Sequence, residues 1–357
     1  MQTSFVDLLR CLRCRQRLEL TPFTDADGGR EVVDGVLACR CQASYPVVGA
    51  IPRMLTGAYR MFPEFVNRYR SQLKLVSDEP LPAAGDFDRT QARTQRSFGY
   101  QWTTFSEIAT DYRENFLTYL HPATPETFRG NLGLDVGCGF GRHLLQAADC
   151  GAEMVGMDFS AAIESSYQNT KHLPNVRLVQ ADIYNVPFEA GTFDFVYSIG
   201  VLHHLPDPKA GFRALLPLVR PGGAIFIWVY SKSRGITNFF LALVRTVTTR
   251  LPHPLVNALS FLGAAIDQYC FVLPYQILRH IPGLGKVVDR VMLPRIKVYS
   301  AYPFGVLHAD WFDRLAAPIR FYYSEGEVER LAQNAGISDV KVTPTGLYGW
   351  RACGIRR

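Results

Sequence analysis

Three aspartates stand at the ends of short apolar segments, where carboxylates are well placed to recognise a ligand. They are Asp135, Asp158 and Asp182. In an open sheet of parallel strands a ligand lies beyond the carboxyl ends of the strands, so these groups are expected to converge on one crevice. A carboxylate after the second strand is placed to accept both hydroxyls of a ribose, and one beside a glycine-rich turn suits an ammonium group.

The first of these aspartates belongs to residues 132–143, LGLDVGCGFGRH. An apolar segment there breaks into glycines and resumes with helix-forming residues. A strand, a glycine-rich turn and a helix bring backbone N–H groups and a helix N-terminus to a ligand. The spacing is G-x-G-x-G, whereas dinucleotides are bound by G-x-G-x-x-G, and Asp135 would repel a pyrophosphate. Both features disfavour an NAD-dependent oxidoreductase.

Four of the eight cysteines lie in the first 41 residues. A C-x2-C pair is followed after 24 residues by a C-x-C pair, and together they are Cys11, Cys14, Cys39 and Cys41. Four thiolates can close a tetrahedral zinc site, which would stabilise a module this small. The alternative is a set of four reduced cysteines without metal. The other cysteines are scattered, which argues against a disulfide framework.

The three aspartates can meet only if a sheet brings the ends of their strands together. The chain alternates strand and helix from Leu132 onward. This alternation predicts an α/β fold with a Rossmann-like sheet of seven mostly parallel strands and helices on both faces. The expected strands are 132–135, 153–157, 176–180, 193–198, 224–230, 340–343 and 350–355.

Three parts are expected along the chain: a zinc-knuckle-like domain at 1–57, a linker at 58–97 and the main domain at 98–357. The linker is predicted to be helical over 65–76 and broken by Pro, Gly and Asp over 79–88. The aromatic segment SFGYQWTTF, starting at Ser97, would either pack against the main domain or cover the ligand as a flap. Charges interrupt the first 20 residues, which predicts no signal peptide and a cytosolic chain.

Residues 231–318 interrupt the alternation with apolar, basic helices punctuated by proline. Residues 231–300 hold nine basic and two acidic residues, a net charge of +7, in a chain whose total is +6. This composition predicts a helical lid that accepts a hydrophobic or anionic acceptor, or that lies on an acidic bilayer, peripherally at the inner membrane face. The alternative is a cap packed by its own apolar faces. Residues 255–275 have the length of a membrane helix, but Asp267 near the middle weakens a spanning interpretation.

Two resemblances to known families follow from these motifs. The stretch CRCQASYPVVGAIPRML resembles the small zinc-binding domain found alongside, or fused to, tRNA and rRNA methyltransferases. That family has two residues between the second pair of cysteines, whereas only Arg40 stands there in this chain, so the second pair must bend more tightly.

The chain from about Tyr100 to the end resembles class I S-adenosylmethionine-dependent methyltransferases, of the small-molecule type related to quinone-biosynthesis C-methyltransferases. The matching motifs are LDVGCGFG, MDFS, ADIYNVPF, FDFVYSIGVLHHLPD and RPGGAIFI, in the family's order and spacing. The resemblance implies S-adenosylmethionine as cofactor, with Asp158 at the ribose. It also implies a cofactor site formed by Asp135, Gly137, Cys138, Gly139, Gly141, Asp158, Phe159, Asp182, Ile183 and Ser198.

His203 and His204 follow the fourth expected strand, where a methyl acceptor would approach. Transfer from a sulfonium is an in-line displacement, which requires alignment, and a base only if the acceptor must lose a proton. Either histidine is therefore a candidate base or orienting group. The alternative is that the His-His-Leu-Pro stretch only shapes the loop.

The sequence favours a methyltransferase for a small-molecule or lipid-like acceptor and leaves open the atom methylated and the oligomeric state. An rRNA or tRNA methyltransferase is the alternative, prompted by the knuckle and by a pI near 8.9. Nucleic acid is the less favoured partner, because the knuckle lacks aromatic residues interleaved with a basic stripe. A non-catalytic protein that binds the cofactor, or that uses zinc for interaction, is the third possibility.

Overall fold

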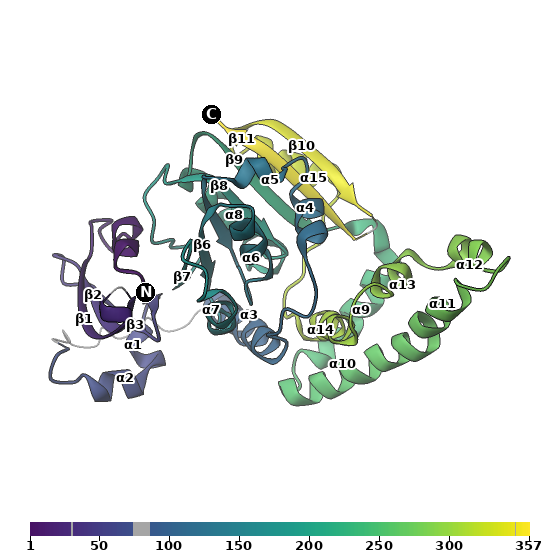
Figure 1. Ribbon diagram of the computed structural model, residues 1–357, viewed down its shortest axis with the longest axis horizontal. Helices are drawn as coiled ribbons and strands as arrows, with labels where there is room; N and C mark the ends of the chain where they lie inside the picture. Colours follow the sequence, from purple (N-terminus) through teal and green to yellow (C-terminus); the bar gives the residue numbers. More distant parts are fainter. Residues whose placement is uncertain (30, 74–85, 347) are drawn as a thin grey trace.

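The computed structural model describes residues 1–29, 31–73, 86–346 and 348–357. Its central element is an eleven-stranded sheet in the order β1-β2-β3-β4-β7-β6-β5-β8-β9-β11-β10, with helices on both faces (Figure 1). The strands are β1 Glu19–Ala26, β2 Glu31–Ala38, β3 Ser44–Val48, β4 Ile51–Met54, β5 Leu132–Val136, β6 Glu153–Asp158, β7 Val176–Ala181, β8 Phe193–Ile199, β9 Val219–Tyr230, β10 Ile337–Thr345 and β11 Gly349–Arg356.

The predicted α/β class is confirmed, but the strand count is larger than seven. Strands β5 to β11 form the expected sheet, parallel from β7 through β9. Strand β11 is antiparallel to both β9 and β10, so β10 runs in the same direction as the parallel strands. The N-terminal strands lengthen it, because β4 pairs with β7 in parallel through Arg53 and Gln180. The fully buried Arg53 guanidinium donates to the Gln180 side chain at 3.1 Å and pairs with Glu164 at 2.6 Å. Long-range pairing of this kind leaves no local signal in the sequence.

The helices outside the insertion cover the strands on both sides of the sheet (Figure 1). Apolar runs in β5 to β9 are buried on both faces, as a covered parallel sheet requires. The helices are α1 Ala58–Met61, α2 Pro63–Arg68, α3 Asp86–Thr104, α4 Arg113–Leu120, α5 Pro125–Phe128, α6 Arg142–Asp149, α7 Ala162–Thr170, α8 Pro208–Leu215 and α15 Glu325–Gln333.

Helix α3 crosses the expected boundary between linker and main domain. Residues 74–85, which hold the end of the predicted 65–76 helix and most of the predicted break, lie outside the described residues. From Asp86 the chain is one continuous helix through Thr104, and it carries Gln91 and Gln95 to the ligand crevice. The domain limits themselves stay a prediction.

The insertion projects from one end of the sheet as a group of helices around α14 (Figure 1). Its cores are small, one around Ala264, Tyr275 and Ile296 and another around Phe312. A π-helical turn, Gln268–Val272, joins α10 to α11 without a break. The helices are α9 Gly235–Thr248, α10 His253–Asp267, α11 Leu273–Leu278, α12 Gly285–Val291, α13 Pro294–Tyr299 and α14 Phe304–Ala316.

Candidate functional site

A cavity of about 760 Å³ lies beyond the carboxyl ends of β5 to β8. One half is formed by those strand ends, and the other by α4 and the insertion, with α3 along its side. The three aspartates Asp135, Asp158 and Asp182 all line the cavity, as the strand order predicted.

The glycine turn after β5 forms the floor of this crevice. Gly137 has a φ of +78°, and a Cβ there would lie 2.3 Å from a Val201 methyl group. Gly139 lines the cavity too, and its N–H donates to Asp158 Oδ2 at 2.9 Å. Gly141 does not line it; its φ is +87°, and a Cβ would meet Ser166 Oγ at 2.8 Å. Gly141 thus permits close packing of α6 against α7, which is a different role from direct contact with a ligand.

Asp135 is the most perturbed acid of the site. Its side chain is 3% exposed, and Oδ2 has no hydrogen-bond partner among the described residues. Burial raises the pKa of Asp135 to about 8, with Asp158 adding to the rise, while Tyr197 and Arg142 act against it. A buried carboxyl oxygen without a partner, on a cavity wall, fits the ammonium of an amino-acid ligand.

Asp158 and Asp182 are each held by hydrogen bonds from a backbone N–H and from a side chain. Asp158 Oδ1 accepts from the N–H and hydroxyl of Ser160 at 2.8 and 2.7 Å. Asp182 accepts from Tyr184 N–H at 3.0 Å and from Gln91 Nε2 at 2.8 Å. Burial raises the pKa of both acids. The apolar side chains expected to flank an adenine, Phe159 and Ile183, line the same half of the cavity.

Of the two remaining residues predicted to bind the cofactor, Cys138 lines the cavity and Ser198 does not. Cys138 lines the cavity, and burial raises the pKa of its thiol, which is therefore neutral. Ser198 is fully buried away from the described cavity wall, and its hydroxyl donates to Val136 O at 3.1 Å. The expectation for Ser198 is corrected accordingly: it ties β8 to β5, because its side chain points into the protein between these strands.

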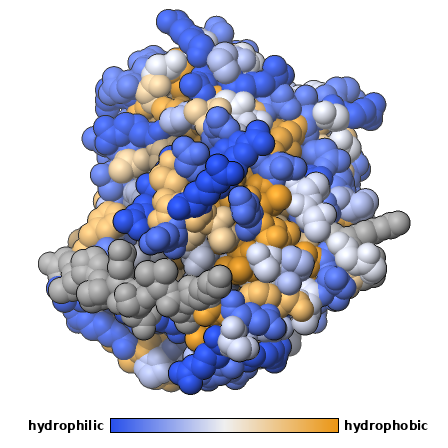
Figure 2. Space-filling model, turned by 90° about the vertical axis from the view of Figure 1, so that its left-hand side faces the viewer, coloured by the Kyte–Doolittle hydropathy of each residue, from blue (hydrophilic) through white to orange (hydrophobic). Residues whose placement is uncertain are grey.

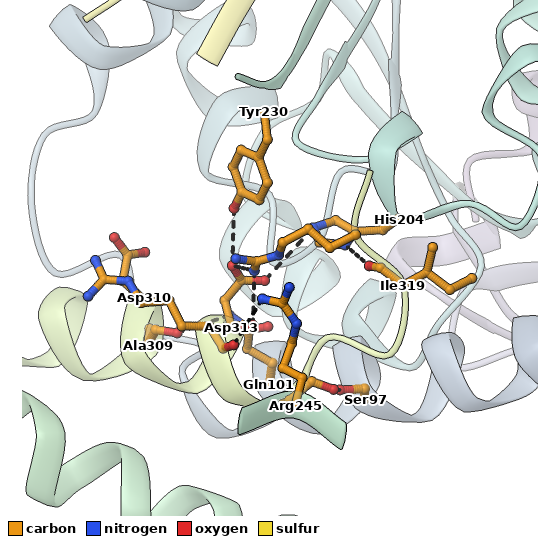
Figure 3. A network of polar contacts seen from close by, with 12 residues as sticks. Ser97, Gln101, His204, Tyr230, Arg245, Ala309, Asp310, Asp313 and Ile319 are labelled. Atoms are coloured by element: carbon orange, nitrogen blue, oxygen red, sulfur yellow. Dashed lines mark hydrogen bonds and ion pairs between the residues drawn. The ribbon is translucent and has the colours of Figure 1, made fainter. Parts of the chain in front are cut away.

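His204 lines the cavity and belongs to a network that joins the loop after β8 to the insertion (Figure 3). Its Nδ1 donates to Ile319 O at 2.6 Å, and Nε2 lies 3.9 Å from Asp313 Oδ1. Asp313 also accepts from Tyr230 at 3.0 Å and pairs with Arg320. Burial lowers the pKa of His204 to about 4, with Arg320 acting in the same direction. The imidazole is therefore neutral near pH 7.

His203 is placed differently from the expectation. Its ring is fully buried against Tyr230, with 4.0 Å between the ring centroids, and it is absent from the described cavity wall. Neither ring nitrogen has a hydrogen-bond partner among the described residues, and burial lowers the pKa well below its usual value. Since His203 lies behind His204, the pair cannot both face an acceptor, and direct base catalysis by His203 does not fit this geometry.

Several cavity residues were missed from the sequence. Arg142 lines the cavity next to Asp135 and lies over the rings of Trp102 and Tyr112, 5.7 and 5.3 Å from their centroids. It makes no ion pair among the described residues. Gly-Arg at the start of α6 was the available signal, because a guanidinium one residue after the turn must lie near the ligand.

The aromatic segment serves both of its expected roles. On α3, Trp102 lies 3.5 Å from where a Gly139 Cβ would stand and so covers the glycine turn. Phe98 lines the cavity and packs on His204, with 4.8 Å between the ring centroids. Gln101 donates to Ala309 O at 3.2 Å, which fixes α3 to α14 (Figure 3).

The half of the cavity that α4 and the insertion form is rich in tyrosine and arginine. Tyr119 and Tyr302 line it together with Arg234, Arg295 and Arg314 from the insertion. Arg295 pairs with Asp267 at 2.5 Å, and Arg314 donates to Tyr299 at 2.8 Å. Arg234 lies 5.0 Å from the Tyr348 ring centroid and has no ion pair among the residues described. Burial lowers the pKa of Arg234, and Arg314 and Arg295 lower it further.

The N-terminal cysteines form a second site, and none of them lines the cavity. The sulfurs of Cys11, Cys14, Cys39 and Cys41 all lie within 4.8 Å of one another. Two of the distances are 3.6 Å (Cys11 to Cys41) and 3.4 Å (Cys14 to Cys39). Sulfurs in a tetrahedral zinc site are ~3.8 Å apart. The four residues therefore fit a structural zinc ion. The chain turns directly after the C-x-C pair, where Gln42 has a φ of +70° and its N–H donates to Cys39 O at 2.9 Å.

The comparisons with known proteins agree with this site. Residues 134–227 match a family model described as a methyltransferase domain. Demethylmenaquinone methyltransferase from Staphylococcus haemolyticus is 37% identical over 101 residues, 27% of this chain and 42% of that protein. tRNA U34 carboxymethyltransferase from Pseudoalteromonas atlantica is 37% identical over 98 residues, 26% of this chain and 30% of that protein. The chain thus spans less than half the length of either relative.

Among solved structures, 1,6-didemethyltoxoflavin-N1-methyltransferase from Burkholderia thailandensis aligns with 79% of this chain and 97% of its own, at 15% identity and a TM-score of 0.44. The family model covers the strands and turns from β5 into β9, among which the three aspartates lie. The part of this chain that matches the methyltransferase-domain model, residues 134–227, thus holds the glycine turn and all three aspartates of the cavity.

Proposed function

We propose that this protein transfers a methyl group from S-adenosylmethionine to a small-molecule or lipid-like acceptor. The observation that carries the proposal is that one cavity of about 760 Å³ joins the three strand-end aspartates to a wall supplied by the insertion. A volume of this kind accommodates a small ligand beside a cofactor, and its enclosure by α3 and α14 leaves little room for a folded nucleic acid.

The sulfonium supplies a methyl group that is already activated, so the chain's own tasks are binding, alignment and exclusion of water. Asp135 would receive the ammonium of the cofactor's amino-acid end, and Arg142 its carboxylate. Asp158 would accept from the ribose hydroxyls, and the Gly139 backbone holds that carboxylate in place. Trp102 and Phe98 would exclude water from the reacting atoms.

We infer no side-chain base for the reaction. His143 also lines the cavity, and burial lowers its pKa well below the usual value. Of the two histidines after β8, His204 reaches the cavity, but with a pKa of about 4 it would accept a proton poorly at neutral pH. Its Nδ1 proton is committed to the Ile319 carbonyl. His204 is better suited to anchor the loop after β8, through its hydrogen bond to Ile319 O, than to remove a proton.

The insertion supports an acceptor with an anionic group. Arg234 is a half-buried guanidinium without a carboxylate partner among the described residues, and Arg295 and Arg314 lie close enough to lower its pKa. A carboxylate or phosphate would relieve this repulsion and accept hydrogen bonds from the planar guanidinium. An anionic metabolite or an anionic lipid headgroup would satisfy the same requirement.

The experiment is incubation of the protein with methyl-labelled cofactor and fractionated cell extract. We expect label in the lipid or metabolite fraction and none with Asp158→Asn. Arg234→Gln should reduce labelling of the acceptor at least tenfold, because a hydrogen bond to a charged group contributes roughly 1.5–3 kcal/mol to binding. Calorimetric binding of S-adenosylhomocysteine should be unchanged.

A nucleic-acid acceptor is the second candidate, favoured by the similarity to a tRNA-modifying enzyme and by the zinc-type knuckle. Label that enters RNA and is resistant to organic extraction would overturn the small-molecule proposal. If S-adenosylhomocysteine binds but no fraction takes up label, a non-catalytic cofactor-binding protein becomes the better description.

A further inference from the structure

The insertion carries an apolar stripe that nothing in the described chain covers. Helices α10 and α11, joined by the π-helical turn, form one helix of 26 residues, His253–Leu278. Only 28% of its most apolar 18-residue stretch is buried. Large side chains at steps of three and four residues are exposed along its length, with Tyr269 at 69%. They include Leu255, Leu259, Leu262, Ile266, Tyr269 and Ile277.

Length and composition alone would let this helix cross a membrane, but its other face is committed to the protein. Asp267 is buried, pairs with Arg295 at 2.5 Å and accepts from Trp311 Nε1 at 2.7 Å. Trp311 of α14 packs so closely that a Cβ at Gly263 would lie 2.7 Å from its ring. Spanning would separate this carboxylate from its partners, so a helix that lies flat, with one face outward, is the arrangement that keeps these contacts.

Helix α9 offers a second exposed stripe of the same kind. Ile236, Phe239, Leu243 and Val247 follow one another at helical spacing and are 78%, 66%, 60% and 60% exposed. On its inner side, Asn238 and Leu241 line the cavity. The helix therefore lies between the part of the cavity that the insertion lines and the outer surface of the insertion.

Most of the exposed large hydrophobic residues lie in the insertion. Among the described residues, the large hydrophobic side chains that are exposed elsewhere are Met61, Phe87, Phe321 and Ile355. At the knuckle end of the molecule, hydrophilic side chains are interspersed with apolar ones (Figure 2). The concentration in the insertion marks an interaction surface, because a soluble surface seldom gathers so many apolar side chains.

The charges that flank this surface indicate its partner. Arg250 precedes the long helix, and Arg279, Lys286 and Arg290 follow it, all exposed. From 235 to 300 the acids are Asp267, which is buried and paired, and Asp289. A second copy of this chain would bring like charges together across the apolar stripe, whereas an anionic bilayer offers hydrocarbon and negative headgroups together.

We propose that the outer face of α9 and of the helix 253–278 docks in the plane of an anionic lipid bilayer, as a peripheral contact. The apolar stripe would enter the headgroup boundary, and the flanking cations would bind the lipid phosphates. This proposal is independent of methyl transfer, since it concerns a surface outside the cavity.

The test uses the full chain with sedimentable vesicles of phosphatidylcholine, alone or mixed with phosphatidylglycerol. We expect binding to the mixed vesicles, weakened by salt. Leu262→Ser with Ile266→Ser should weaken it roughly tenfold or more, because two apolar side chains lose their burial. Lys286→Gln with Arg290→Gln should reduce binding to the mixed vesicles only, and Met61→Ser, an exposed apolar residue elsewhere, is the matched control.

The thermal transition and S-adenosylhomocysteine binding of each variant report whether it is folded. Failure to bind mixed vesicles overturns the proposal, as does equal binding by the Leu262/Ile266 variant. Sedimentation velocity that shows a dimer, lost in the same variant, would assign the face to a second copy instead. Because binding of vesicles and labelling of an acceptor are separate measurements, failure of the one is distinguishable from failure of the other.

Discussion

The pKa of Asp135 predicts that cofactor binding depends on pH in a defined window. Its carboxyl has a pKa of about 8 in the free protein, raised chiefly by burial. An ammonium ligand requires the ionised form, so binding below pH 8 must include loss of a proton. The cost is ~1.4 kcal/mol for each pH unit below the pKa, or ~2.7 kcal/mol at pH 6. The dissociation constant should therefore rise roughly tenfold from pH 7 to pH 6.

The sign of the stability change is the opposite. Because the folded-state pKa lies above the unfolded value of ~3.9, neutral Asp135 contributes stability that is complete below about pH 4 and is lost as the pH rises through 8. The ligand-free protein thus loses stability over the same range in which its affinity for the cofactor increases.

The assay is titration calorimetry with S-adenosylhomocysteine, which keeps the ammonium group, between pH 5.5 and 7.5. Repeating it in buffers of different ionisation enthalpy counts the protons released, and we expect close to one. Asp135→Asn should weaken binding at pH 7 by roughly 1.5–3 kcal/mol and remove most of the pH slope. Asp182→Asn is the matched control, which should lose affinity but keep the slope. If Asp135→Asn retains the tenfold slope, another group titrates and the assignment of the ammonium to Asp135 is refuted.

Three further predictions concern the glycine turn, Arg142 and the zinc site. Gly137→Ala should lower the free energy of unfolding, measured in urea, by more than Gly222→Ala, because both have a φ near +78° but only the first would meet a neighbour, at 2.3 Å; equal losses would mean that Val201 moves aside freely. Arg142→Gln should weaken S-adenosylhomocysteine about tenfold and adenosine hardly at all, as calorimetry would show; equal weakening would place Arg142 elsewhere. The purified chain should hold one zinc ion by elemental analysis, lost in Cys39→Ser and kept in Cys270→Ser, whose cysteine lies outside the cluster.

The parts of the site that the sequence predicted are those fixed by local geometry. Asp135, Asp158 and Asp182 each lie at the carboxyl end of a buried strand. Because parallel strands end at one edge of the sheet, their convergence follows from the strand order. The glycine turn is equally local, since its residues are neighbours in the chain. The cysteine cluster needed only the cysteine spacing and a turn tight enough for the C-x-C pair.

The parts that it did not predict depend on the direction of side chains or on distant pairing. Neighbouring residues of a strand point to opposite faces, and a motif alone does not say that Ser198 faces β5. His203 and His204 are neighbours in the short 3₁₀ helix Leu202–His204, and the motif does not show which of them reaches the cavity, as His204 does. The sequence places Gln91 in the linker. Its contact with Asp182 could not be predicted, because the two residues are 91 positions apart in the chain.

The basic character of residues 231–300 is a further case in which one property of the sequence has two structural meanings. Helix geometry divides these cations: Arg234 and Arg295 line the cavity, while Arg250, Arg279 and Lys286 are exposed outside it. From the sequence, a lid over an anionic acceptor and a contact with an acidic membrane were alternatives. In the fold they are compatible, because α9 has one face toward each. An acceptor taken from a bilayer would need both, and the Leu262/Ile266 and Arg234 variants change the two functions separately.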